Sequence, residues 1–176
     1  MTLARLTDVL TPAAASRAGL GAFNVFSIEH AEAFTAAAEA ADTPVVLQIS
    51  QNAVRYHKAL APIGLATLTL AHSTAVPVVV HLDHATETNL VTEAVGLGFG
   101  SVMFDGSTMP YEDNVAATAA VARHCHDAGL DVEAELGEIG GKEGVPAREP
   151  NPTRPGHLSR PRVSTRWASL LARLMP

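Results

Sequence analysis

The chain has 176 residues, of which 47% are hydrophobic, 17% charged and 5% aromatic. This length suits one domain, and the apolar share is too high for intrinsic disorder. The single cysteine, Cys125, excludes an internal disulfide framework and a cysteine-cluster zinc site. No apolar run reaches the ~18 residues of a membrane span, and the first residues lack the apolar core of a secretory signal. We therefore expect a cytoplasmic protein with no membrane partner.

The net charge of −6 is distributed unevenly along the chain. Residues 1–144 have a net charge of −11, whereas residues 145–176 have a net charge of +5 and contain six of the 11 prolines. This change predicts a folded body over residues 1–144 and a basic Pro/Arg-rich tail over residues 145–176. The body has no basic stripe, and prolines interrupt the arginines of the tail, so we expect no nucleic-acid partner.

The body alternates between helical and strand-like patterns. The pattern predicts helices over residues 3–18, 28–41, 62–75, 86–97 and 112–128, the first ending at Gly19 and the second capped by Ser27. It predicts strands over residues 21–25, 43–49, 76–82, 99–104 and 130–136, with a turn after the second strand. Continuous Val/Ile/Leu strands between helices indicate an α/β fold with a parallel sheet. An open doubly wound sheet and part of a (β/α)8 barrel both fit, although five strands are too few to close such a barrel.

Polar residues stand at or just after the end of every predicted strand. They are Asn24, Ser50, Asp83, His84, Asp105 and Glu135. In barrels and open α/β sheets alike, ligands bind at the carboxyl edge of the strands. The pattern therefore indicates a functional site at this edge.

The sequence His81-Leu-Asp-His84 ends an otherwise apolar strand. Alternation places His81 and Asp83 on one face, with His84 at the mouth of the strand. Neutral imidazole is a common zinc ligand, and a neighbouring carboxylate can act as an acid or base. A polar cap on the strand end is the alternative interpretation.

Two carboxylates, Glu133 and Glu135, lie two residues apart and therefore share a face of their strand. Burying both is costly unless they are paired or bind a metal, whereas helix capping or solvent exposure would leave them without a function. A simple turn at Asp105-Gly106 would likewise account for that aspartate.

Residues 137–144 contain four glycines, which predicts either a mobile lid with a catalytic group or an ordinary flexible turn.

Three motifs occur in order: VPVVVHLDH at 76–84, GFGSVMFDGS at 98–107 and VEAELGEIGG at 132–141, preceded by AFNV at 22–25 and VLQIS at 46–50. With these motifs, residues 1–144 resemble the zinc-dependent class II fructose-bisphosphate and tagatose-bisphosphate aldolases. The resemblance implies a (β/α)8 barrel, a Zn²⁺ cofactor and reversible cleavage of a sugar bisphosphate into dihydroxyacetone phosphate and an aldehyde. It also implies a homodimer or homotetramer.

The resemblance assigns a role to each motif residue. By motif position, His84 would be a ligand of the catalytic zinc, and Asp105 and Glu135 would form a second position for the same ion. The other roles that the resemblance implies concern the substrate. Asp83 would be the acid or base at its C4 hydroxyl, and Glu143 would be the mobile proton donor. Asn24 and Ser50 would contact the substrate.

The resemblance ends at about Gly144. Full-length members of the family continue through three more β/α units, which supply two further zinc histidines and phosphate-binding loops. Residues 145–176 suit an out-of-frame reading of a GC-rich gene, with a short paralogue as the competing idea. We therefore expect a partial barrel that is poorly active alone. The alternatives are a non-catalytic fragment, an assembly subunit completed by another chain, and a sugar-phosphate or metal binding module without turnover.

Overall fold

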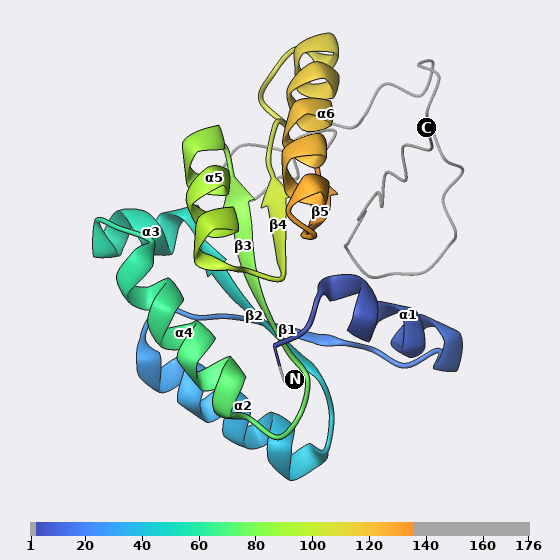
Figure 1. The fold of residues 1–176 in the computed structure, drawn as a ribbon, viewed down its shortest axis with the longest axis vertical. Coiled ribbons are helices and arrows are strands. Elements are labelled where there is room, and N and C mark those ends of the chain that lie inside the picture. The colour runs from blue at the N-terminus through green and yellow to red at the C-terminus, as the bar shows by residue number, and fades with distance from the viewer. Residues whose placement is uncertain (1–2, 136–176) are drawn as a thin grey trace.

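The computed structural model describes residues 3–135, which form a parallel five-stranded sheet flanked by helices (Figure 1). The strands are β1 (Gly21–Asn24), β2 (Val45–Ser50), β3 (Val78–Ala85), β4 (Ser101–Phe104) and β5 (Asp131–Ala134). They lie side by side in the order β1-β2-β3-β4-β5. A doubly wound sheet reverses its strand order, so this uninterrupted order identifies part of a barrel. The predicted α/β class and partial barrel are confirmed.

Each connection between strands contains at least one helix. The helices are α1 (Leu6–Ser16), α2 (Ile28–Ala41), α3 (Gln51–His57), α4 (Ala61–Ser73), α5 (Thr88–Leu97) and α6 (Tyr111–Asp127). The prediction of a turn directly after the second strand was wrong, because helix α3 occupies this position. Its first turn is stabilised by the Ser50 hydroxyl, which accepts a hydrogen bond from the Ala53 amide at 3.2 Å. None of the helices within residues 3–135 is long and apolar enough to cross a bilayer.

The first helix is shorter than predicted at both ends. The chain enters it in an extended conformation, because the Ala4 amide donates to the Val78 carbonyl at 2.9 Å and places this segment beside β3. The helix ends at Ser16, where Arg17 adopts a left-handed conformation with φ 56°. Gly19, the predicted stop, therefore lies beyond the actual end of the helix.

The two faces of the sheet pack against different helices. Leu47 and Ile49 of β2 belong to the main apolar core, together with residues of α2, α4 and α5. Val46 points to the opposite face and contributes to a second cluster with Leu6 and Val9 of α1. Figure 1 shows α1 apart from the other helices. This packing covers the inner face near the amino ends of the strands and leaves the carboxyl ends for polar groups.

Candidate functional site

The inner face of the sheet changes from apolar to polar along the strands. The strand register aligns Asn24, Gln48, His81, Ser101 and Asp131 in one row across all five strands. Val46 and Val79 precede this row by two residues and pack under α1, whereas Asp83 follows it by two residues. Because side chains alternate along a strand, these residues share the inner face. The predicted site therefore lies at the carboxyl edge of the sheet.

A β-bulge turns His84 toward this inner face. The pairing of β3 with β4 is regular up to Leu82–Val102 and then resumes at Ala85–Phe104, so Asp83 and His84 together lie opposite one residue. His84 has φ 50°, a left-handed conformation that costs a non-glycine residue about 1–3 kcal/mol. Simple alternation would place His84 among the helices on the outer face. The bulge instead allows two consecutive side chains to reach the site.

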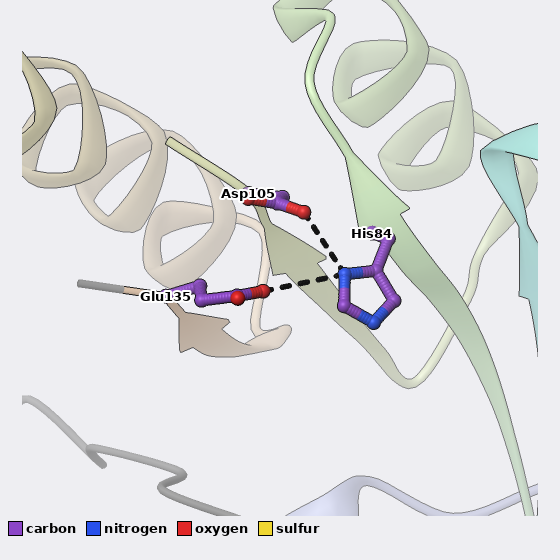
Figure 2. A group of neighbouring side chains, drawn as sticks. All are labelled: His84, Asp105 and Glu135. Carbon is purple, nitrogen blue, oxygen red and sulfur yellow. Dashed lines mark hydrogen bonds and ion pairs between the residues drawn. The ribbon is translucent and has the colours of Figure 1, made fainter. Parts of the chain in front are cut away.

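His84 meets two carboxylates from the neighbouring strand ends (Figure 2). Its Nδ1 lies 2.9 Å from Asp105 Oδ2 and 3.4 Å from Glu135 Oε2. Both acidic side chains are buried, and one potential ligand atom from each of the three residues lies within 4.8 Å of the others. One imidazole nitrogen and two carboxylate oxygens are a donor set that suits Zn²⁺. The structure thus brings together the three residues that the resemblance assigns to metal binding.

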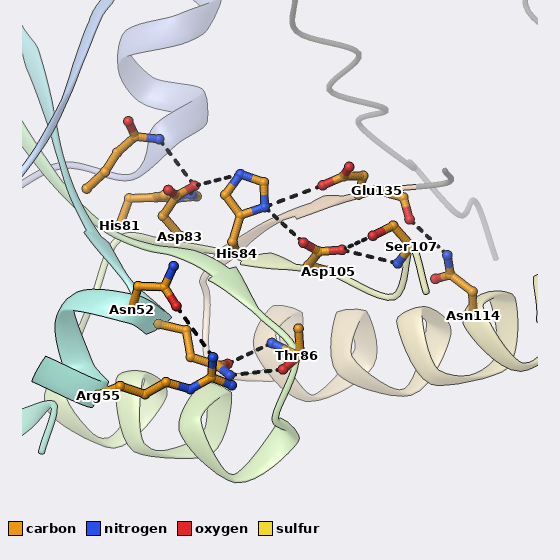
Figure 3. A network of polar contacts seen from close by, with 12 residues as sticks. Asn52, Arg55, His81, Asp83, His84, Thr86, Asp105, Ser107, Asn114 and Glu135 are labelled. Atoms are coloured by element: carbon orange, nitrogen blue, oxygen red, sulfur yellow. Dashed lines mark hydrogen bonds and ion pairs between the residues drawn. The ribbon is translucent and has the colours of Figure 1, made fainter. Parts of the chain in front are cut away.

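Hydrogen bonds from neighbouring residues hold both carboxyl-bearing segments in place (Figure 3). Asp105 Oδ1 accepts hydrogen bonds from the Ser107 amide at 3.1 Å and from the Ser107 hydroxyl at 2.5 Å. The bond from the amide forms an Asx-type turn. The side-chain amide of Asn114 on α6 donates to the Glu135 carbonyl at 2.8 Å. The Ser107 contacts orient the Asp105 carboxylate, and the Asn114 contact fixes the backbone that carries Glu135. Fixing metal ligands in this way is the usual function of the groups around them.

Asp83 lies beside this cluster and is also buried. Its Oδ1 is 3.5 Å from Gln48 Nε2 and 4.0 Å from the Nε2 atoms of both His81 and His84. Three side-chain nitrogen atoms therefore lie near one oxygen of this carboxylate, and one of them belongs to the histidine that would bind the metal. This geometry suits a group that accepts a proton from a metal-bound substrate.

Burial changes the ionisation of two groups near Asp83. Burial, with a smaller contribution from nearby His84, lowers the pKa of His81 to about 3, so its imidazole is neutral at pH 7. Burial and the charge of Asp83 raise the pKa of Glu133, while His84 opposes this shift. A low-dielectric pocket with several acidic groups is a setting in which a divalent cation binds favourably.

The remaining predicted site residues are placed differently. Asn24 ends β1 and is exposed, in register with Gln48. Ser50 aligns with Asp83 across β2 and β3, but its hydroxyl also caps α3. Glu143 lies outside the described residues, as does the predicted tail. No described contact joins Asn24 or Ser50 to the metal-binding cluster.

Three supporting residues were absent from the predicted site: Gln48, Ser107 and Asn114. The sequence contained a signal for Ser107, because an aspartate two residues before a serine in a Gly-containing turn is typical of an Asx turn. Gln48 is a polar residue within a buried strand, which is itself unusual. Asn114 lies on α6 without a local pattern that would distinguish it.

Comparisons with known proteins place this chain among aldolases and agree with its fold. A family model described as class-II fructose-bisphosphate aldolase matches residues 4–170. The chain is 36% identical to a fructose-bisphosphate aldolase of Staphylococcus aureus and 38% identical to a probable fructose-bisphosphate aldolase of Bacillus subtilis, each over 145 residues. Both alignments cover 81% of this chain and 51% of the relative, so the chain spans about half the length of these curated relatives. The crystal structure of the YdjI aldolase from Escherichia coli matches with a TM-score of 0.71 at 28% identity, over 77% of this chain and 52% of that one.

Proposed function

The chain belongs to the class II fructose-bisphosphate aldolase family, and we propose that it is a zinc-dependent ketose-bisphosphate aldolase. Its substrate would be fructose 1,6-bisphosphate or tagatose 1,6-bisphosphate, which differ in the configuration of one hydroxyl group. The products would be dihydroxyacetone phosphate and glyceraldehyde 3-phosphate. The observation that supports this most strongly is the convergence of His84, Asp105 and Glu135 beside Asp83 at the carboxyl edge of the sheet.

In this proposal, His84, Asp105 and Glu135 hold the ion. Zinc, when bound, supplies a Lewis acid that draws electron density from the substrate carbonyl. We expect low turnover of this chain by itself, because its ligand set differs from that of the family. The cluster described within residues 3–135 contributes one imidazole and two carboxylates. The resemblance implies three histidines as zinc ligands.

Two carboxylates would move protons during cleavage. Asp83 takes the proton of the C4 hydroxyl while the C3–C4 bond breaks and C4 becomes the aldehyde carbon. The electron pair of the broken bond remains on the dihydroxyacetone phosphate half, and Glu143 returns a proton to C3. Asn24 and Ser50 would contact the substrate. Aldol condensation runs through the same proton transfers in reverse.

An assembly role is the second candidate function. In the described part of the chain, the sheet ends at β1 and β5, each paired with a strand on one side. Phe23 on β1 is 45% exposed and Phe26 just after it is 51% exposed. An open strand edge beside apolar side chains favours addition of further strands. In this alternative, another chain completes the barrel, and the two together form the active enzyme.

Zinc binding can be measured directly by equilibrium dialysis of the full chain. We expect the wild-type chain to bind zinc and His84→Ala to bind it at least tenfold more weakly, because one of three ligands is lost. His126→Ala is the matched control, since His126 is exposed on α6. Equal zinc affinity in wild type and His84→Ala would refute this metal site.

Aldolase activity can be measured with zinc by following dihydroxyacetone phosphate formed from each bisphosphate. We expect weak cleavage by the chain and at least a ~10²-fold loss of kcat in Asp83→Asn, which removes the proton acceptor. Glu93→Gln, an exposed change on α5, should leave kcat unchanged. Zinc binding without cleavage would reject the stand-alone aldolase. Activity that appears only after a second chain is added would support the assembly role.

A further inference from the structure

His81 presents a buried nitrogen toward the proposed proton acceptor. The side chain is 1% exposed, and its Nδ1 lies 2.7 Å from the Ser101 hydroxyl. Its Nε2 has no hydrogen-bond partner within the described residues and lies 4.0 Å from Asp83 Oδ1. A buried polar atom without a partner is costly, so its position beside Asp83 requires an explanation.

The contacts of His81 favour one of its two neutral tautomers. If Nδ1 carried the proton, the Nε2 lone pair would face the negatively charged oxygen of Asp83, which is repulsive. If Nε2 carries the proton, the Ser101 hydroxyl donates to Nδ1 and the N–H dipole points toward the carboxylate. Burial disfavours the doubly protonated, charged ring. The Nε2–H tautomer therefore gives Nδ1 a hydrogen-bond donor and gives the Nε2–H group an attractive neighbour in Asp83.

We infer that His81 is a positioning residue for Asp83, held by Ser101 as the Nε2–H tautomer. Together with Gln48 Nε2, at 3.5 Å from the same oxygen, it attracts Oδ1 and directs the other carboxylate oxygen to the substrate. At 4.0 Å the contact is a charge–dipole attraction, and an approach of about 1 Å would make it a hydrogen bond. This inference rests on the proposed function of Asp83 as the proton acceptor.

Two substitutions separate positioning from simple filling of space. His81→Gln places an amide nitrogen near the original Nε2 and keeps a donor for Asp83. His81→Asn is shorter, so its polar group reaches only the Nδ1 position near Ser101. Circular dichroism and thermal unfolding of both variants establish that they fold, and Ser101→Ala tests the tautomer without changing the histidine.

The tautomer is measurable by long-range ¹H–¹⁵N NMR of the full chain at pH 7, with the His81 signals assigned by their absence in His81→Gln. We expect a protonated Nε2 and an unprotonated Nδ1 in the wild type. In Ser101→Ala we expect a mixture of tautomers, because Nδ1 has lost its donor. A wild-type Nδ1–H tautomer, or a doubly protonated ring, would overturn the inference.

The role of His81 is measurable from kinetics and crystal structures of the variants. We expect kcat to fall roughly 10- to 100-fold in His81→Asn, the range for losing an interaction with a charged group, with KM changed less than about twofold. His81→Gln should retain kcat within about threefold. Equal kcat in His81→Asn and wild type would overturn the inference. If neither the wild type nor any variant cleaves either bisphosphate, the proposed function fails, and the crystal structures test the inference separately. We then expect the Asp83 carboxylate to turn away from Gln48 in His81→Asn but not in His81→Gln. The same Asp83 orientation in both variants would overturn the inference.

Discussion

The contact between Gly106 and Asn114 predicts that one methyl group will destabilise the candidate site. Gly106 follows Asp105, and a Cβ atom at Gly106 would overlap the Asn114 carboxamide. Asn114 is 2% exposed and is fixed at both ends: it donates to the Glu135 carbonyl and accepts from the Thr118 hydroxyl at 2.9 Å. Because the carboxamide has no solvent space to enter, Gly106→Ala must displace either it or the loop after β4.

The expected loss follows from these contacts. Displacing Asn114 leaves the buried Glu135 carbonyl without this donor, which costs about 1–3 kcal/mol. Overpacking adds a strain of similar size, about 1–3 kcal/mol. We therefore expect Gly106→Ala to lower the free energy of unfolding by about 2–6 kcal/mol. Zinc affinity should also fall, because Glu135 and Asp105 both shift.

Urea unfolding at equilibrium measures this loss, with zinc absent so that binding does not contribute. Gly96→Ala is the matched control, since a Cβ there meets no atom within 4 Å and alanine favours the helix by about 0.5–1 kcal/mol. Adding Asn114→Ala to Gly106→Ala removes the overlap, so the double variant should be no less stable than Asn114→Ala. A Gly106→Ala loss below about 0.5 kcal/mol, or fully additive effects, would refute the reasoning.

Three further predictions concern other parts of the described chain. Asp131→Ala should lower the free energy of unfolding in urea by about 2–4 kcal/mol, because the Asp131 carboxylate accepts hydrogen bonds from the Thr7 amide at 2.7 Å and the Thr7 hydroxyl at 2.9 Å. The control is Asp127→Ala at an exposed position, which should change this free energy by less than about 0.5 kcal/mol. The Cys125 thiol should react with a disulfide reagent only after unfolding in guanidinium, since burial raises its pKa to about 11; rapid reaction of the native chain would contradict this. The folded pKa of His81 is about 3, below the unfolded value of ~6.5, so its contribution to stability falls as the pH drops below ~6.5, by up to ~1.4 kcal/mol per unit. The stability difference between wild type and His81→Gln should shrink accordingly between pH 7 and pH 5, and a constant difference would contradict this assignment.

The alternation of apolar strands and helices along the sequence was sufficient to predict the α/β class and all five strands of the described region. This succeeded because each buried strand is a run of Val, Ile and Leu, a pattern that depends on neighbours in the chain. The same pattern placed Asp83, Asp105 and Glu135 at one edge of the sheet, since parallel strands end together. The choice between a barrel and a doubly wound sheet needed the strand order, which no local pattern specifies.

The details of the site depended on contacts between distant segments. The sequence placed His84 at a strand end, but only the bulge against β4 turns it to the inner face, because its left-handed conformation is stable when the surrounding sheet imposes it. Asn114 supports Glu135 across 21 residues, and Asp131 caps α1 from the far end of the described chain. Local sequence thus determined which chemical groups reach this edge, whereas tertiary packing decided their direction and partners, because both depend on the register between strands far apart in the chain.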